Sequence, residues 1–419
     1  AMAVFTCTDK NCASAQFVDA TVKQTSGVTT AAVNFNGKDY TAKYGEKNGW
    51  VEENGKKYWY EKGVKQGTTG RGKEIYDPDS DAWYWLDAVQ GGAMTVSKDV
   101  YQESAAGQWA DKPDGTGKWV RYDENGHMVK GWQTTDKGTY YFDLITGAMA
   151  KGAGDIDGVP CAFDEYTGIA LDGQWLTIKG ADFWYEKGVR QGLDGRGKEI
   201  YDPASDAWYW LDAVDQGKKA TSKDVYQESE AGQWADRADG TGKWVRYDEN
   251  GHMVKGWQTT DKGTYYFDLI TGAMAKGAGD IDGVPCAFDE YTGIALDGQW
   301  LTIKGADFWY EKGVRQGLDG RGKEIYDPAS DAWYWLDAVD QGKKATSKDV
   351  YQESEAGQWA DRADGTGKWV RYDAQGHMIK GWSADKRYYF DPIYGTMAKG
   401  DAVIDGRTYH FDKNTGIRQ

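Results

Sequence analysis

The feature that most constrains this chain is a long internal duplication with a period of 125 residues. Residues 114–248 reappear without a change as residues 239–373, and a more diverged stretch precedes them. A catalytic site needs unlike groups that converge once, whereas duplication multiplies like surfaces along a chain. The repeat therefore favours binding in series, and we predict no catalytic residue, no metal site and no cofactor.

A shorter rhythm runs inside each module, where extended aromatic runs are followed by turns of glycine, asparagine and aspartate. Examples are Lys73–Asp77, Ala82–Asp87 and Gly138–Asp143. Six such segments in 125 residues give units of about twenty residues, the size of a two-stranded hairpin with its linker. Such a hairpin is marginal alone because it buries too little surface. We therefore predict an all-β fold, an elongated β-solenoid of stacked β-hairpins.

The composition indicates an interior built from aromatic rings. The chain has 21 Trp and 28 Tyr but only 11 Leu, so ring side chains with a polar edge must supply most of the core. Its net charge of −16 would repel a phosphate backbone, which argues against a nucleic-acid partner. Mean hydropathy is −0.76 and no run approaches the roughly 20 apolar residues that a bilayer needs, so we predict no membrane span.

The tryptophan distribution divides the chain into two domains. Residues 3 to about 45 contain no Trp and alternate as half-buried strands do. The first residues show no charged and then apolar leader, so either a secretion signal has been removed or the sequence is part of a longer chain. We predict a partial small β module or linker at 1–45 and a repeat solenoid at 46–419, with modules near 59–183, 184–308 and 309–419.

One longer, mostly polar stretch interrupts the rhythm in each module. It covers 88–117 in the first module and 213–242 in the second. We interpret it as a loop elaboration, in which Lys223–Ser229 forms a short helical or irregular excursion.

The repeated pattern resembles a known family. It places tryptophan before a short polar spacer, then two or three aromatics, a glycine turn and Met, as in Gly117–Tyr122, Met128, Gly131–Trp132, Tyr140–Phe142 and Gly147–Met149. This is similar to the cell-wall-binding repeats of Gram-positive surface proteins, the group that includes choline-binding and glucan-binding repeats. The resemblance covers about 46–419 and implies a hairpin solenoid, secretion, a location at the cell wall or cell surface, and attachment to a cell-wall polymer or glycan.

The resemblance also implies ligand-binding residues. In choline-binding members, two Trp, a Tyr and often a Met form a cage for a quaternary ammonium, because electron-rich ring faces attract a desolvated cation. The positions that match this cage recur in three sets: Trp119, Met128, Trp132, Tyr140 and Met149; Trp244, Met253, Trp257, Tyr265 and Met274; Trp369, Met378, Trp382, Tyr388 and Met397.

The residues leave several alternatives open. The same rings could fill the interior and bind nothing, or stack on the apolar face of a neutral sugar instead of a cation. We hypothesise a non-catalytic module that attaches to a cell-wall glycan or teichoic-acid-type polymer, with choline as a candidate ligand. The alternatives are an adhesin whose repeat loops bind a host immunoglobulin or mucosal glycoprotein, and the C-terminal tail of a larger wall-bound enzyme.

The four cysteines divide into two pairs. Cys7 and Cys12 are close in sequence and could form a disulfide, as in an exported protein. Cys161 and Cys286 occupy equivalent positions one module apart, where the third copy has Tyr409. A bridge requires Cα atoms about 4.4 to 6.8 Å apart, so we predict that both are free and buried in place of an aromatic ring.

Overall fold

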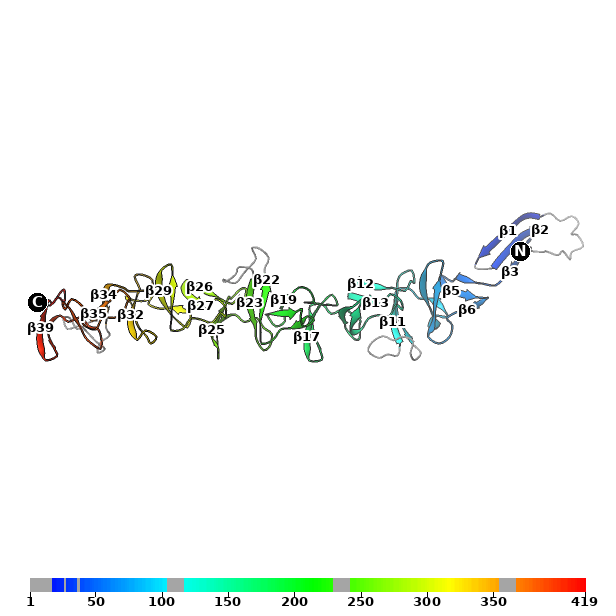
Figure 1. Ribbon diagram of the computed structural model, residues 1–419. Coiled ribbons are helices and arrows are strands. Elements are labelled where there is room, and N and C mark those ends of the chain that lie inside the picture. The colour runs from blue at the N-terminus through cyan, green and yellow to red at the C-terminus, as the bar shows by residue number, and fades with distance from the viewer. Residues whose placement is uncertain (1–16, 26–27, 36–37, 104–116, 229–241, 354–366) are drawn as a thin grey trace, which may run out of the picture. The chain divides into compact units, whose positions relative to one another are not determined.

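The computed structural model describes residues 17–25, 28–35, 38–103, 117–228, 242–353 and 367–419. Nearly all regular structure in these residues is short β-strand (Figure 1), and the described part of the chain contains no α-helix. By backbone proximity the chain divides into two compact units, Ala1–Lys198 with Leu211–Lys219, and Glu199–Trp210 with Ala220–Gln419. The all-β prediction is confirmed, while the module boundaries stay predictions.

The described part of the N-terminal segment forms a sheet of its own. Strands β1 (Phe17–Thr25), β2 (Val28–Phe35) and β3 (Lys38–Tyr44) pair antiparallel in the order β1-β2-β3. The alternating sequence predicted strands here. Strand β2 pairs with β1 on one side and with β3 on the other, which makes the three strands one sheet.

The rest of the chain is a series of antiparallel hairpins with short extra strands between some of them. The leading hairpin and the first repeat consist of β4 (Gly49–Glu53), β5 (Lys56–Glu61), β6 (Val64–Lys65), β7 (Gly72–Asp77), β8 (Ala82–Asp87), the 3-10 turn η2 (Ala88–Gln90), β9 (Ala93–Met94), β10 (Lys98–Glu103), β11 (Gly117–Tyr122), β12 (Gly131–Thr135), β13 (Gly138–Phe142), β14 (Gly152–Ile156), β15 (Val159–Phe163), β16 (Gln174–Ile178), β17 (Ala181–Glu186) and β18 (Val189–Arg190).

The second repeat follows the same order with β19 (Gly197–Asp202), β20 (Ala207–Asp212), β21 (Lys218–Lys219), β22 (Lys223–Glu228), β23 (Gly242–Tyr247), β24 (Gly256–Thr260), β25 (Gly263–Phe267), β26 (Gly277–Ile281), β27 (Val284–Phe288), β28 (Gln299–Ile303), β29 (Ala306–Glu311) and β30 (Val314–Arg315). The third has β31 (Gly322–Asp327), β32 (Ala332–Asp337), β33 (Lys343–Lys344), β34 (Lys348–Glu353), β35 (Gly367–Tyr372), β36 (Gly381–Trp382), β37 (Tyr389–Phe390), β38 (Gly400–Ile404) and β39 (Arg407–Phe411).

The hairpin count per period differs from the prediction. In the described residues of 72–196, five hairpins are present, β7/β8, β10/β11, β12/β13, β14/β15 and β16/β17. The prediction of six units was wrong because Lys73–Asp77 and Ala82–Asp87 are the two strands of one hairpin, paired from Gly72 with Asp87 to Asp77 with Ala82.

The prediction of a short helical or irregular excursion at Lys223–Ser229 was also wrong. Lys223–Glu228 is strand β22 and pairs along its whole length with β23, with Val225 opposite Val245. The segment alternates buried Val225 and Gln227 with more exposed neighbours, which is the period of a half-buried strand. Residues 104–116, 229–241 and 354–366 lie outside the described residues, so the loop predictions within 88–117 and 213–242 are not tested there.

Backbone hydrogen bonds join each hairpin to the one before it. The segment after β13 pairs Met149 with Phe142 of its own hairpin and donates the Met149 N–H to the carbonyl of Trp119 in β11, at 2.8 Å. The segment after β15 does the same, since Ala170 pairs with Phe163 and donates to Thr139 in β13 at 2.7 Å. Hairpins thus stack through their connecting segments within each unit, and the elongated solenoid as a whole stays a prediction.

Aromatic rings and methionines fill the space between stacked hairpins. Tyr122 and Phe142 are fully buried, and Met128 packs with the cluster around Tyr122 while Met149 packs with Phe142. Gly147 (φ +68°) lies so close to Met128 that a Cβ there would overlap the sulfur. Cys161 and Cys286 are buried and belong to no disulfide in the described residues, which confirms that prediction, whereas Cys7 and Cys12 lie outside the described residues.

Candidate ligand-binding site

The structure distributes each predicted set over three environments. Trp119, Tyr140 and Met149 share one core cluster with Phe142, in which Tyr140 and Met149 are buried. Their equivalents Trp244, Tyr265 and Met274 share the same kind of cluster, and Met397 is buried in the third copy. These side chains are brought together, but as interior packing between stacked hairpins.

The first methionine of each set belongs to a different cluster. Met128 packs against Trp85, Val100 and Tyr122. Met253 and Met378 occupy the same environment in the later copies. The structure therefore separates Met128 from the other members of its set, and the ligand role of the fifteen residues stays a prediction.

Cations of the chain itself already lie over several of the predicted rings. The Arg121 guanidinium lies 4.3 Å from the centre of the Tyr140 ring and forms two hydrogen bonds with the Asp99 carboxylate, at 2.7 and 2.9 Å. That carboxylate raises the pKa of Arg121. Lys151 Nζ lies 5.4 Å from the Trp119 ring. A ring face that holds a paired internal cation is a poor place for a second one.

The remaining member, Trp132, stands in a separate group with rings that the sequence analysis did not select. Trp132 of β12 lies opposite Tyr141 of β13 with ring centres 5.2 Å apart, and Phe163 of the next hairpin lies 5.7 Å away. We call Trp132, Tyr141 and Phe163 the Trp132 ring group. Tyr141 and Phe163 are buried, while Trp132 is 42% exposed, so the group presents one large ring to solvent on a fixed aromatic base.

The backbone closes around one edge of this group. At Gly188 (φ +82°) a Cβ would lie 3.3 Å from the far edge of the Trp132 ring and 2.9 Å from the Ala170 side chain. Glycine therefore lets the chain between β17 and β18 approach the indole closely. Among the described residues, no lysine or arginine lies over the Trp132 ring.

Carboxylates lie near the Trp132 ring group, and Lys130 acts electrostatically on one of them, Asp143. Burial and the nearby carboxylates of Asp157 and Asp143 raise the pKa of the Tyr141 hydroxyl. Burial opposes ionisation of Asp143, but hydrogen bonds from Thr146 and Ile145 outweigh it and lower the pKa of that carboxyl. The ring group thus combines π faces with ionised carboxylates nearby, which together favour a cation.

A cleft of about 240 Å³ lies beside the same rings. Tyr141 and Phe163 line it together with Asp143, Asp155 and Lys151, and Trp132 is not part of its wall. Its wall mixes aromatic, thioether, carboxylate and ammonium groups, which suits a ligand that has both an apolar part and polar groups.

The second copy repeats the arrangement. Trp257 lies 5.2 Å from Tyr266 and 5.7 Å from Phe288, and is also 42% exposed. Gly313 approaches its ring as Gly188 approaches Trp132. One such group therefore lies in each of the two compact units.

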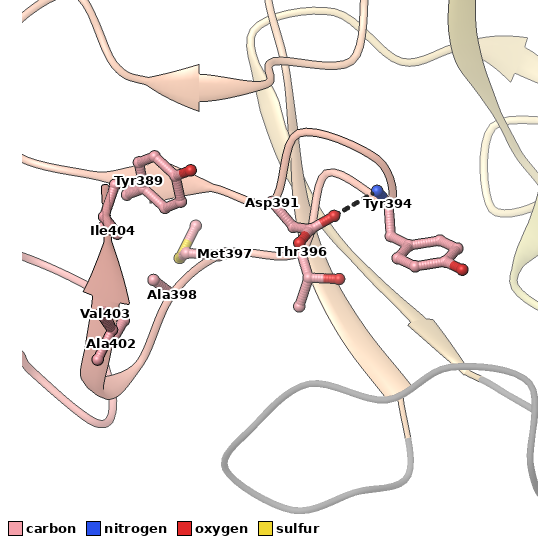
Figure 2. Close-up of a pocket in the computed structure, with 9 residues that line it drawn as sticks. All are labelled: Tyr389, Asp391, Tyr394, Thr396, Met397, Ala398, Ala402, Val403 and Ile404. Carbon is pink, nitrogen blue, oxygen red and sulfur yellow. Dashed lines mark hydrogen bonds between the residues drawn. The ribbon is translucent and has the colours of Figure 1, made fainter. Parts of the chain in front are cut away.

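In the third copy, different side chains surround the tryptophan. Trp382 contacts Tyr389 at 5.2 Å, Tyr409 at 4.9 Å and Phe411 at 6.0 Å. The Arg418 guanidinium lies 5.5 Å from the Trp382 ring and 5.0 Å from the Tyr409 ring. The adjoining cleft is smaller, about 140 Å³, and Figure 2 shows Met397 between Tyr389 and Asp391, while the Tyr394 ring points away from it.

A further ring group was also missed. Trp300 lies 5.0 Å from both Trp309 and Tyr334 and donates its indole N–H to Asp327 at 3.2 Å. Lys344 Nζ lies 5.2 Å from the Trp300 ring and pairs with Asp307 at 2.7 Å. The register of the hairpin could have revealed the Trp132 ring group from the sequence. A two-residue turn at 136–137 places Trp132 opposite Tyr141.

Comparison with known proteins identifies a repeat of known type in two segments of the chain. A model of the choline-binding repeat matches residues 116–153 and 240–278. Glucosyltransferase-S of Streptococcus downei is 28% identical over 220 residues, which cover 48% of this chain and 16% of that protein. The chain thus spans a small part of the length of this curated relative.

No helix in the described residues has the length and apolar character to cross a membrane.

Solved structures of choline-binding proteins were also matched. CbpJ from Streptococcus pneumoniae is 17% identical, with 79% of this chain and 99% of that chain covered and a TM-score of 0.35. Choline binding protein F from the same organism is 17% identical, with 79% and 98% covered and a TM-score of 0.36. The two matched segments are therefore choline-binding repeats, a type of cell-wall-binding repeat, as the sequence pattern predicted.

Proposed function

We propose that the repeat region binds the quaternary ammonium group of a choline-bearing cell-wall polymer at the Trp132 ring group and at its copy around Trp257. The observation that carries the proposal is a half-exposed indole on a buried aromatic base, with the Asp143 and Asp157 carboxylates nearby and no internal cation over it in the described residues. The protein would act as a non-catalytic attachment module.

The energetics suit weak, repeated contacts. A cation over a favourable ring gains about 0.5 to 2 kcal/mol, so one group of two or three rings binds free choline only weakly. A polymer that engages both groups gains from the high effective concentration of the second contact. On this proposal the protein is exported and held at the cell surface of a Gram-positive bacterium through its wall polymer.

The test is choline binding and wall retention of the whole chain. We expect titrated choline to bind, and retention on purified walls that carry choline to be reversed by free choline. Trp132→Ala should remove one binding site and Trp132→Ala with Trp257→Ala should remove both. Trp83→Ala is the matched control, because Trp83 is 37% exposed and lies beside Tyr76 at 5.3 Å on another hairpin.

The same experiment separates the sugar alternative. If glucan binds, choline does not compete, and Trp132→Ala with Trp257→Ala abolishes glucan binding, the ring groups bind sugar and the cation proposal is wrong. If Trp83→Ala reduces binding as much as Trp132→Ala, the ring group is not the site.

A further inference from the structure

The third ring group differs from the first two at two positions, and one of them introduces a charge. Arg418 pairs with Phe411 in the bridge that follows its hairpin, where Ala170 pairs with Phe163 and Ala295 with Phe288. The backbone is therefore equivalent, and the methyl group of the first two copies is replaced by a guanidinium.

The guanidinium lies within reach of two ring faces. It is 5.5 Å from the Trp382 ring and 5.0 Å from the Tyr409 ring, within the roughly 6 Å over which a ring face attracts a cation. Tyr409 takes the place of the cysteine found in the first two copies and adds a ring that Arg418 contacts. Trp382 is accordingly less exposed than Trp132 and Trp257.

The chain uses the same device at another ring group. Lys344 lies 5.2 Å from the Trp300 ring and 5.7 Å from the Tyr334 ring, held by Asp307. An internal cation over a tryptophan is thus a recurrent feature of these repeats.

We propose that Arg418 is an intramolecular occupant of the Trp382 ring group, and that it closes this copy to a ligand cation. The side chain is a specificity-determining residue that acts by competition: a second cation would have to displace the guanidinium or accept its repulsion. This inference rests on the proposed function, because it assumes that the equivalent ring groups bind a quaternary ammonium.

The test compares choline stoichiometry in full-length variants, with choline chloride as the probe and sodium chloride at equal ionic strength as the reference. Arg418→Ala restores the residue of the first two copies and should bind one more choline per chain than the unaltered protein. Arg418→Lys keeps a cation and should bind no more than the unaltered protein. Arg418→Ala with Trp382→Ala should lose the gained site, which locates it.

The outcomes separate the two proposals. If the unaltered chain binds choline at Trp132 and Arg418→Ala binds no more, the occupancy inference is wrong and the proposed function stands. If the unaltered chain binds no choline but Arg418→Ala binds one, the inference stands and the assignment of Trp132 is wrong. If Arg418→Lys gains a site as Arg418→Ala does, charge is not what closes the group.

Discussion

At the scale of single residues, the rings of this protein are distinguished by what already lies on their faces. Tyr140 holds Arg121, Trp119 holds Lys151 and Trp382 holds Arg418. The chain has a net charge of −16, so its lysines and arginines have many carboxylates with which to pair. Their position over rings is therefore set by the local packing of the hairpins and not by a shortage of carboxylates. In the described residues, no lysine or arginine lies over the half-exposed faces of Trp132 and Trp257, where the proposal places the ligand.

A charge cluster around Glu53 at the first hairpin should make the stability of that hairpin depend on pH. Hydrogen bonds from Lys47, Lys65 and Tyr60 lower the pKa of Glu53 to about 2. Because the folded pKa lies below the ordinary value, this group stabilises the hairpin fully above the ordinary glutamate pKa and loses that contribution as pH falls toward 2. An NMR titration of the Glu53 carboxyl should show the low midpoint.

Removing the donors provides the control for this prediction. In Lys47→Ala with Lys65→Ala the Glu53 midpoint should return toward its ordinary range. An unchanged midpoint in that variant would assign the shift to something other than the two ammonium groups.

At the scale of elements, the connection after each hairpin holds the stack together. Met128 lies against Gly147 of the following hairpin, and Met149 lies against Gly168 in the same way. These close approaches pair a flexible thioether with a glycine, which lets consecutive hairpins pack without a gap.

Substitution of Gly147 tests this contact. Gly147→Ala should destabilise its unit by about 2 kcal/mol or more, from overpacking against Met128 added to the strain of a positive φ, and urea unfolding measures it. Gly158→Ala is the matched control, because Gly158 has φ +80° and no atom within 4 Å of a built Cβ.

The difference between the two variants isolates the overlap with the methionine. Gly147→Ala with Met128→Ala should recover part of the loss, and equal costs in Gly147→Ala and Gly158→Ala would show that the Met128 contact is unimportant.

A largely buried ion pair, Lys118 with Glu74, links strands β7 and β11 and the turn after β13 in the first repeat. Lys118 is 2% exposed, lies 3.5 Å from Glu74 and donates to the carbonyl of Thr146 at 2.6 Å. Burial lowers the pKa of Lys118. Tyr122 donates to Glu74 at 3.2 Å and receives a hydrogen bond from Gln102 at 2.7 Å. The pair therefore fixes the position of β7 against β11 and the turn after β13.

Breaking this pair should be costly, and replacing both partners should not. Lys118→Met leaves Glu74 without its ammonium partner and should destabilise the unit by about 3 kcal/mol, whereas Lys118→Met with Glu74→Leu should recover most of that. Urea unfolding of both variants measures the difference. A single variant as stable as the parent would show that the pair contributes nothing.

At the scale of the whole molecule, the duplication supplies one Trp132-type ring group to each compact unit. If one polymer chain engages both, retention on walls exceeds what either group provides. Linked sites typically gain about 10² to 10⁴ in avidity.

This gives a prediction that free choline alone does not test. Trp257→Ala should halve the choline stoichiometry attributed to these two groups but shorten retention on walls by about a hundredfold or more, measured as the dissociation rate from immobilised wall polymer. A dissociation rate that merely doubles would show that the two groups bind independently of one another.

The sequence by itself determined the class of the fold. A 125-residue duplication of short aromatic runs leaves few structures other than stacked hairpins, and the equivalence of Cys161 and Cys286 was enough to predict buried free thiols. These inferences depend on periodicity and composition, which a repeat carries in every copy.

Only the tertiary structure decided which rings meet and which are already occupied. Trp119, Met128 and Trp132 belong to one set in the repeat pattern, yet each packs between a different pair of hairpins. Their neighbours are determined by how the hairpins stack and not by proximity in the sequence. The Arg418 guanidinium reaches Trp382 from 36 residues away along the chain, and a contact of that kind depends on how hairpins pack across the stack.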